Sequence, residues 1–279
     1  MSNILIPTDF SENSLNAIKY AISFFKEREV NFYVLHVFLV NEMDEGECYY
    51  KNSDVLIDQK IAISSSEKLQ IELQIIKNLT TNNKHSFHSI FEYSQFIEAI
   101  RKCVVEKNIN YIVMGTKGAS KYSNTVLGSH TADVITRVKC NVLVIPEKAR
   151  YSKPENIVFP TDFNIYYKNK LLNSLSEIIK SNCSKLSVLY ISNKVRDLTP
   201  LQKKNRNYLE DYLQDKPHSF YFISNASIDN AIEDFASKNP VDMIAMIAKN
   251  LNLFQRTLFQ PIVAKISYHT KVPFLVLHE

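Results

Sequence analysis

The sequence predicts an α/β protein made of two tandem doubly wound domains, each with a five-stranded parallel sheet and helices on both faces. Two observations carry this prediction: a long internal repeat, and apolar strand-like runs that alternate with runs of helical periodicity. Alternating strands and helices favour a parallel sheet covered on both faces, and right-handed crossovers make it doubly wound.

The repeat is anchored by the phrase Pro-Thr-Asp-Phe, which occurs at residues 7–10 and again at 160–163, an offset of 153. The offset is 154 at the second strand, 133 at the third, and 132 at the fourth and last. The second copy therefore lacks about 21 residues between its second and third strands. We expect domains at 1–147 and 154–279, joined by a charged, proline-containing linker.

Each copy can be followed in order. In the first, strands are expected at 3–6, 31–37, 86–93, 111–114 and 141–146, and helices at 14–26, 61–79, 96–107 and 131–138. In the second, strands are expected at 156–159, 185–191, 219–223, 243–246 and 273–277, and helices at 167–180, 198–213 and 228–238. The first helix illustrates the signal, because Leu15, Ile18, Ile22 and Phe25 recur at helical spacing. The polar stretch 41–60 is expected to be a surface insertion.

Composition narrows the function classes. The chain has 279 residues, a net charge of +4 without a long basic run, and no apolar stretch of membrane-spanning length, so neither nucleic acid nor a membrane is expected as a partner. The N-terminus does not resemble a signal peptide. The four cysteines are far apart and indicate reduced thiols in a cytoplasmic protein, with no metal site.

Three of the four glycines lie between one strand and the next helix: Gly115, Gly118 and Gly128, the last followed by Ser129. A glycine allows positive φ or the close approach of another group to the backbone. A strand, a glycine-bearing loop and a helix N-terminus together suit a phosphate. On spacing alone, a glycine turn followed by a helix cap explains the pattern equally well.

This Gly-x2-Gly-x9-Gly-Ser pattern resembles the nucleotide-binding motif of the universal stress protein family, in its ATP-binding branch. The resemblance covers both copies and implies a Rossmann-like fold of the adenine nucleotide α-hydrolase type. It implies that the phosphates of ATP, ADP or AMP, with Mg²⁺ as a candidate companion, meet the loop after the fourth strand. The residues so assigned are Gly115, Gly118, Gly128, Ser129 and Thr131. Lys117 is added as a source of positive charge, for which a solvated loop lysine is an equally good interpretation, and His130 is included as the neighbour of Ser129.

The resemblance places the adenosine end against the ends of the first two strands, at Pro7, Thr8, Asp9 and Val37, with Met114 as a pocket wall or a core residue. Asp9 either accepts a hydrogen bond from the ligand or caps the following helix. Its counterpart Asp162 is retained in the second copy, which indicates that this turn also has a structural purpose. His36 is more simply a core histidine.

The second copy has lost the glycine pattern. Gly115, Gly118, Gly128 and Ser129 correspond to Ile247, Asn250, Gln260 and Pro261. We expect one nucleotide site per chain, in the first domain, and a second domain that is a packing partner. Domains of this family commonly pair through their last strands, which suggests that residues 142–144 and 274–276 pair within the chain. Two chains could pair further as a homodimer.

Two functions compete. The first is a stress-response sensor or regulatory protein that binds an adenine nucleotide and has no catalytic residues. The alternative is a nucleotide-hydrolysing or adenylyl-transferring enzyme of similar architecture, for which His130 and Asp133 are the nearest acid–base candidates. A helix residue with no catalytic role is the simpler interpretation of His130.

Overall fold

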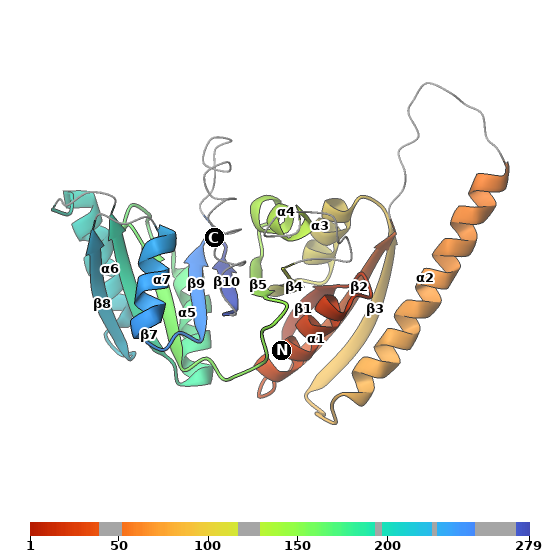
Figure 1. The fold of residues 1–279 in the computed structure, drawn as a ribbon, viewed down its shortest axis with the longest axis horizontal. Coiled ribbons are helices and arrows are strands. Elements are labelled where there is room, and N and C mark those ends of the chain that lie inside the picture. The colour runs from red at the N-terminus through yellow and green to blue at the C-terminus, as the bar shows by residue number, and fades with distance from the viewer. Residues whose placement is uncertain (39–51, 117–128, 193–196, 225–227, 249–271) are drawn as a thin grey trace, which may run out of the picture.

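The computed structural model describes residues 1–38, 52–116, 129–192, 197–224, 228–248 and 272–279, and only the backbone at 52–63 and 228–230. Strands and helices alternate along the first part of the chain and again along the second, as Figure 1 shows by colour from red to blue. The α/β class predicted from the repeat is confirmed.

The first half contains five strands and four helices among the described residues. In chain order these are β1 (Ser2–Pro7), α1 (Glu12–Phe24), β2 (Val30–Phe38), α2 (Asn52–Asn78), β3 (His85–Tyr93), α3 (Phe96–Glu106), β4 (Tyr111–Gly115), α4 (Ser129–Arg137) and β5 (Asn141–Ile145). The helix expected at 61–79 begins at Asn52 instead, so part of the polar stretch 41–60 is helical.

The second half repeats this order with five strands and three described helices. They are β6 (Asn156–Thr161), α5 (Asn169–Asn182), β7 (Lys185–Ser192), α6 (Pro200–Leu213), β8 (His218–Ser224), α7 (Ile228–Lys238), β9 (Met243–Ile247) and β10 (Phe274–Leu277). Helix α6 begins with a capping box, in which Thr199 and Gln202 each bond the other's backbone N–H, and with a proline in its first turn.

The ten strands found among the described residues form one sheet, in the order β3-β2-β1-β4-β5-β10-β9-β6-β7-β8. Neighbours within each half are parallel, and β5 and β10 meet antiparallel in the middle, with Leu143 opposite Leu275. Strand β1 pairs with β2 on one side and β4 on the other, so the strand order reverses between β1 and β4. In such sheets, ligands bind at the carboxyl ends of the strands beside this reversal.

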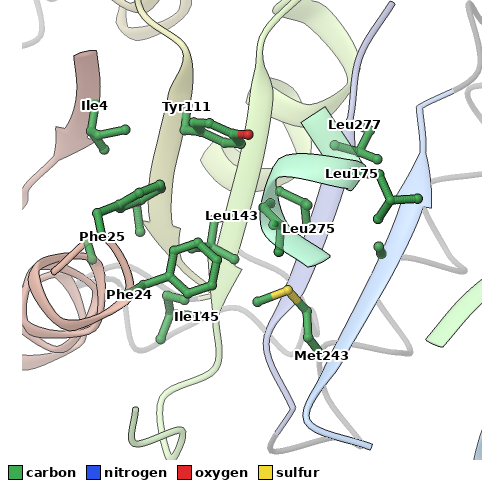
Figure 2. Close-up of a cluster of buried hydrophobic side chains, with 14 of the residues drawn as sticks. Ile4, Phe24, Phe25, Tyr111, Leu143, Ile145, Leu175, Met243, Leu275 and Leu277 are labelled. Atoms are coloured by element: carbon green, nitrogen blue, oxygen red, sulfur yellow. The ribbon is translucent and has the colours of Figure 1, made fainter. Parts of the chain in front are cut away.

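The core lies in two layers, one on each face of the sheet, and each layer runs across both halves. Helices α1, α2, α5 and α6 cover one face, and α3, α4 and α7 cover the other. Figure 2 shows Phe25 and Tyr111 of the first half in the same cluster as Leu275 and Met243 of the second. Among the described helices, none combines the length and apolarity that a bilayer crossing needs.

Candidate functional site

The carboxyl end of β1 turns sharply through residues 8–11. The Thr8 hydroxyl accepts the backbone N–H of Phe10 at 3.1 Å, and the Asp9 carboxylate accepts that of Ser11 at 3.1 Å. Phe10 has a φ of 62°, which is unusual for a non-glycine residue. Ser11 then caps α1, because its hydroxyl accepts the N–H of Ser14 at 3.2 Å. Asp9 is therefore not the cap of this helix.

The same turn is built in the second half. Thr161 accepts the N–H of Phe163 at 3.0 Å, Asp162 accepts that of Asn164 at 3.0 Å, and Phe163 has a φ of 57°. Side chains that bond the backbone two residues ahead stabilise such turns in any context. The structural purpose suggested by the retained Asp162 is therefore confirmed, and Pro-Thr-Asp alone is no mark of a ligand site.

Gly115, at the end of β4, lies directly against the first turn of α1. A Cβ at this position would lie 2.8 Å from Asn13 Nδ2 and 2.9 Å from Asn13 Cγ, which is closer than real Cβ atoms approach. Gly115 does not have a positive φ. Of the two needs that a glycine meets, close approach is therefore the one that applies here.

The start of α4 is tied to the same point, because the Thr131 hydroxyl donates to the carbonyl of Gly115 at 2.9 Å. The N-termini of α1 and α4 thus both lie beside the ends of β1 and β4. Their charges differ. The first turn of α1 carries Glu12 and follows Asp9, whereas the first turn of α4 carries no acidic residue. An anion is consequently favoured at α4 rather than at α1.

The side chains at the start of α4 differ in their exposure and in their contacts. Ser129 and His130 are exposed, and Thr131 is buried. The His130 ring stacks on Phe96 with centroids 4.5 Å apart, and Asp133 is ion-paired with Arg137 at 3.3 Å. The simpler interpretation of His130 as an exposed helix residue agrees with this placement.

The end of β2 closes the other side of the β1 turn. His36 Nδ1 donates to the carbonyl of Thr8 at 2.9 Å, and its ring lies 4.3 Å from that of Phe10, so His36 is a half-buried, satisfied histidine. Val37 is half-buried and packs against the core. Met114 is buried in that core, which agrees with its interpretation as a core residue.

Three of the predicted phosphate residues, Lys117, Gly118 and Gly128, lie outside the described residues. The same holds for Asn250 and Gln260, the counterparts of the two glycines, and for Pro261, the counterpart of Ser129. The structure brings together Thr8, Asp9, Gly115 and Thr131. Pro7 ends β1 next to them.

In the second half, different residues surround the ends of the equivalent strands. Ile247 stands where the first half has Gly115 and is buried, and Tyr166 stands at the position of Asn13 with its ring exposed. The place of Ser14 is taken by Tyr167, which is fully buried and bonds the Thr161 hydroxyl at 2.7 Å. The contact between a glycine and an asparagine is therefore a property of the first half.

Two residues next to the ends of β1 and β4 were missed by sequence reasoning. Asn13 lies in the first turn of α1, and Glu72 of α2 receives a hydrogen bond from the Thr8 hydroxyl at 3.2 Å. The close approach of Asn13 to Gly115 could have been suspected from the paired loss of both in the second copy. No motif surrounds Glu72, and its helix lies in the region where the two copies differ in length.

Comparison with known proteins now identifies the family. The model of the universal stress protein family matches residues 1–146. The chain belongs to the universal stress protein family. Two curated relatives come from Methanocaldococcus jannaschii. Universal stress protein MJ0577 is 27% identical over 157 residues, covering 52% of this chain and 94% of the relative. Universal stress protein MJ0531 is 30% identical over 142 residues, covering 51% and 80%.

A solved structure matches the whole length of the chain. It is a universal stress protein from Archaeoglobus fulgidus, with a TM-score of 0.71, 18% identity, and coverage of 99% of this chain and 96% of that one. At this identity the likeness shows the fold alone, and it does so for both halves together.

Proposed function

We propose that this protein binds an adenine nucleotide, ATP, ADP or AMP, in its first half, and that it acts as a sensor or regulator in a stress response. The single observation that carries the proposal is the convergence at Gly115. Three features coincide there: α1 approaches the glycine closely, α4 begins without an acidic residue in its first turn, and the strand order reverses. Family membership and the glycine pattern support it.

The charge distribution supports an orientation for the nucleotide. Phosphates meet the N-terminus of α4, where Ser129 is exposed and the helix dipole favours an anion. The nucleoside end meets the β1 turn, where Asp9 and Glu12 disfavour phosphate. Mg²⁺ is proposed only as a companion of the phosphates.

We further propose that the protein binds the nucleotide without a dedicated catalytic apparatus. The two acid–base candidates nearest to the loop are held in other contacts, His130 against Phe96 and Asp133 with Arg137. General acid–base catalysis needs a group within hydrogen-bond reach of the reacting atoms. Measurement of ATP turnover by the purified protein tests this part separately from binding.

We propose one site per chain, because the buried Ile247 replaces Gly115 in the second half. The second half then serves as the packing partner of the first, through the β5–β10 pair and the shared core. Sedimentation of the purified protein tests the further proposal that two chains form a homodimer.

The deciding experiment is to denature the purified protein and quantify the released nucleotide by chromatography, then to titrate the stripped protein with ATP. Release of about one adenine nucleotide per chain supports the proposal. The proposal is refuted if no nucleotide is released and the stripped protein does not bind ATP. Gly118→Val should abolish binding and leave the far-ultraviolet circular dichroism unchanged, whereas Gln260→Val in the second half, at the place that corresponds to Gly128, should leave binding unaltered.

A further inference from the structure

The carboxyl group of Glu72 lies at the end of β1, although its helix α2 follows β2. Its Oε1 accepts the Thr8 hydroxyl at 3.2 Å. Its Oε2 is shielded from solvent and has no hydrogen-bond partner in the part of the chain that the structure describes. A polar atom that is shielded from solvent and has no hydrogen-bond partner destabilises the folded state. Such an atom beside a candidate site therefore needs a physical reason.

The turn does not need Glu72 to satisfy Thr8. The Ser14 hydroxyl uses its proton on the carbonyl of Ser11 at 2.8 Å, and its oxygen lies 3.1 Å from Thr8 Oγ1. The Thr8 proton can therefore point to Ser14 whenever Glu72 is absent. Since the N–H of Phe10 still donates to Thr8, the turn keeps its hydrogen bonds without the carboxylate.

The second half shows how the same turn is closed without an acid. Thr161 bonds the hydroxyl of Tyr167, whose ring fills the space beside it, and the Gln202 amide donates to the carbonyl of Asp162 at 2.8 Å. Both groups are neutral and both are satisfied. A carboxylate at this place is therefore specific to the half that keeps the glycine pattern.

The chemistry of a carboxyl oxygen determines what it can recognise. It accepts hydrogen bonds from neutral donors and repels phosphate. Burial raises the pKa of Glu72, and the Asp9 carboxylate raises it further, so a donor on the ligand would compensate an unfavourable environment. On a nucleotide the available donors are the ribose hydroxyls and the exocyclic amine of the base.

We propose that Glu72 is a recognition residue for the nucleoside end of the bound nucleotide, with Oε2 accepting a hydrogen bond from a ribose hydroxyl or from the base amine. This inference rests on the proposed nucleotide site in the first half. It adds to that site a residue from α2, and it places the donor-bearing end of the ligand on the side away from α4.

The test compares ligands as well as proteins. Isothermal titration of the nucleotide-free protein is carried out with ATP, 2′-deoxy-ATP, 3′-deoxy-ATP and purine riboside triphosphate, which lacks the amine. The native protein should bind one of these three analogues at least about tenfold more weakly than ATP, since a hydrogen bond to a charged group contributes about 1.5–3 kcal/mol. The analogue concerned identifies the donor.

Glu72→Leu removes the acceptor and should weaken the binding of ATP by the same factor. The ratio between the dissociation constants of that analogue and of ATP should therefore fall to about one. Glu67→Leu is the matched control on the exposed side of the same helix and should leave the ratio unchanged. Glu72→Gln keeps the shape with a neutral acceptor and should reduce the ratio part of the way. It also serves if the leucine variant does not fold.

Two results overturn the inference. One is a native protein that binds ATP and all three analogues equally. The other is a preference for ATP that persists unchanged in both Glu72 variants. A native protein that binds no ATP refutes the proposed function itself, which is a different failure from either of these.

Discussion

The approach of Asn13 to Gly115 makes a prediction with a magnitude. Gly115→Ala places a Cβ 2.8 Å from Asn13 Nδ2, about 0.6 Å inside ordinary van der Waals contact. The amide must leave its rotamer, at a cost of about 0.5–1.5 kcal/mol. Loss of chain freedom in the unfolded state returns about 0.4–1 kcal/mol. We therefore expect a net destabilisation of about 1 kcal/mol or less.

The coupling between the two residues is a sharper quantity than the single effect. In Asn13→Ala/Gly115→Ala the new methyl group meets no amide, so the double variant should be about 1 kcal/mol more stable than the sum of the single changes predicts. Asn16 lies one turn further along α1, where it bonds the carbonyl of Ala149 at 3.1 Å. Asn16→Ala/Gly115→Ala should therefore be additive.

Urea unfolding of the three single and two double variants measures these energies, with the slope of the transition checked for constancy. A coupling below about 0.3 kcal/mol between Asn13 and Gly115 would refute the close approach as the reason for the glycine. The same proteins titrated with ATP report whether displacement of the Asn13 amide also weakens the proposed site.

Single groups support three further predictions. Burial lowers the pKa of His278 to about 4, so the folded chain binds fewer protons than the unfolded chain below the ordinary value of 6.5; stability should fall by about 3 kcal/mol as the pH drops from 6.5 to 4, and His278→Gln should flatten that dependence in urea unfolding. Burial also raises the pKa of Cys140 to about 12, whereas Cys183 is exposed; mass spectrometry after brief alkylation of the native protein at pH 8 should find label on Cys183 and none on Cys140. Asp9→Ala and Asp162→Ala remove equivalent turn contacts and should each lower stability by about 1 kcal/mol or less, but only Asp9→Ala should alter ATP binding.

Much of the fold could be predicted from the sequence, because parallel strands need long crossovers and leave a regular alternation. The constant offset of 132 between 111–114 and 243–246 is enough to match β4 with β9 as equivalent strands of the two copies. The start of α2 was harder to predict. Its first three residues, 52–54, are polar and resemble a loop, and the helix begins at Asn52 rather than near Ile61.

The site was harder to predict because its contacts join residues far apart in the sequence. Gly115 could be singled out by its spacing, but the reason for it, the Asn13 side chain, is a contact across 102 positions. Glu72 reaches Thr8 from a helix in the region where the copies differ in length, so no aligned counterpart exposes it. Spacing identifies a motif, whereas only packing identifies its neighbours.

The repeat supplies a comparison that a single domain would not offer. Whatever both halves share, such as the turn built by Thr8 and by Thr161, is explained by the fold, because the second half has no glycine pattern to serve. Whatever only the first half has needs another explanation. Gly115 and Glu72 pass this test, since their places are taken by a buried isoleucine and by neutral, satisfied groups. The assignment of function therefore rests on these differences and on the acid-free start of α4, and not on the Pro-Thr-Asp phrase that both halves share.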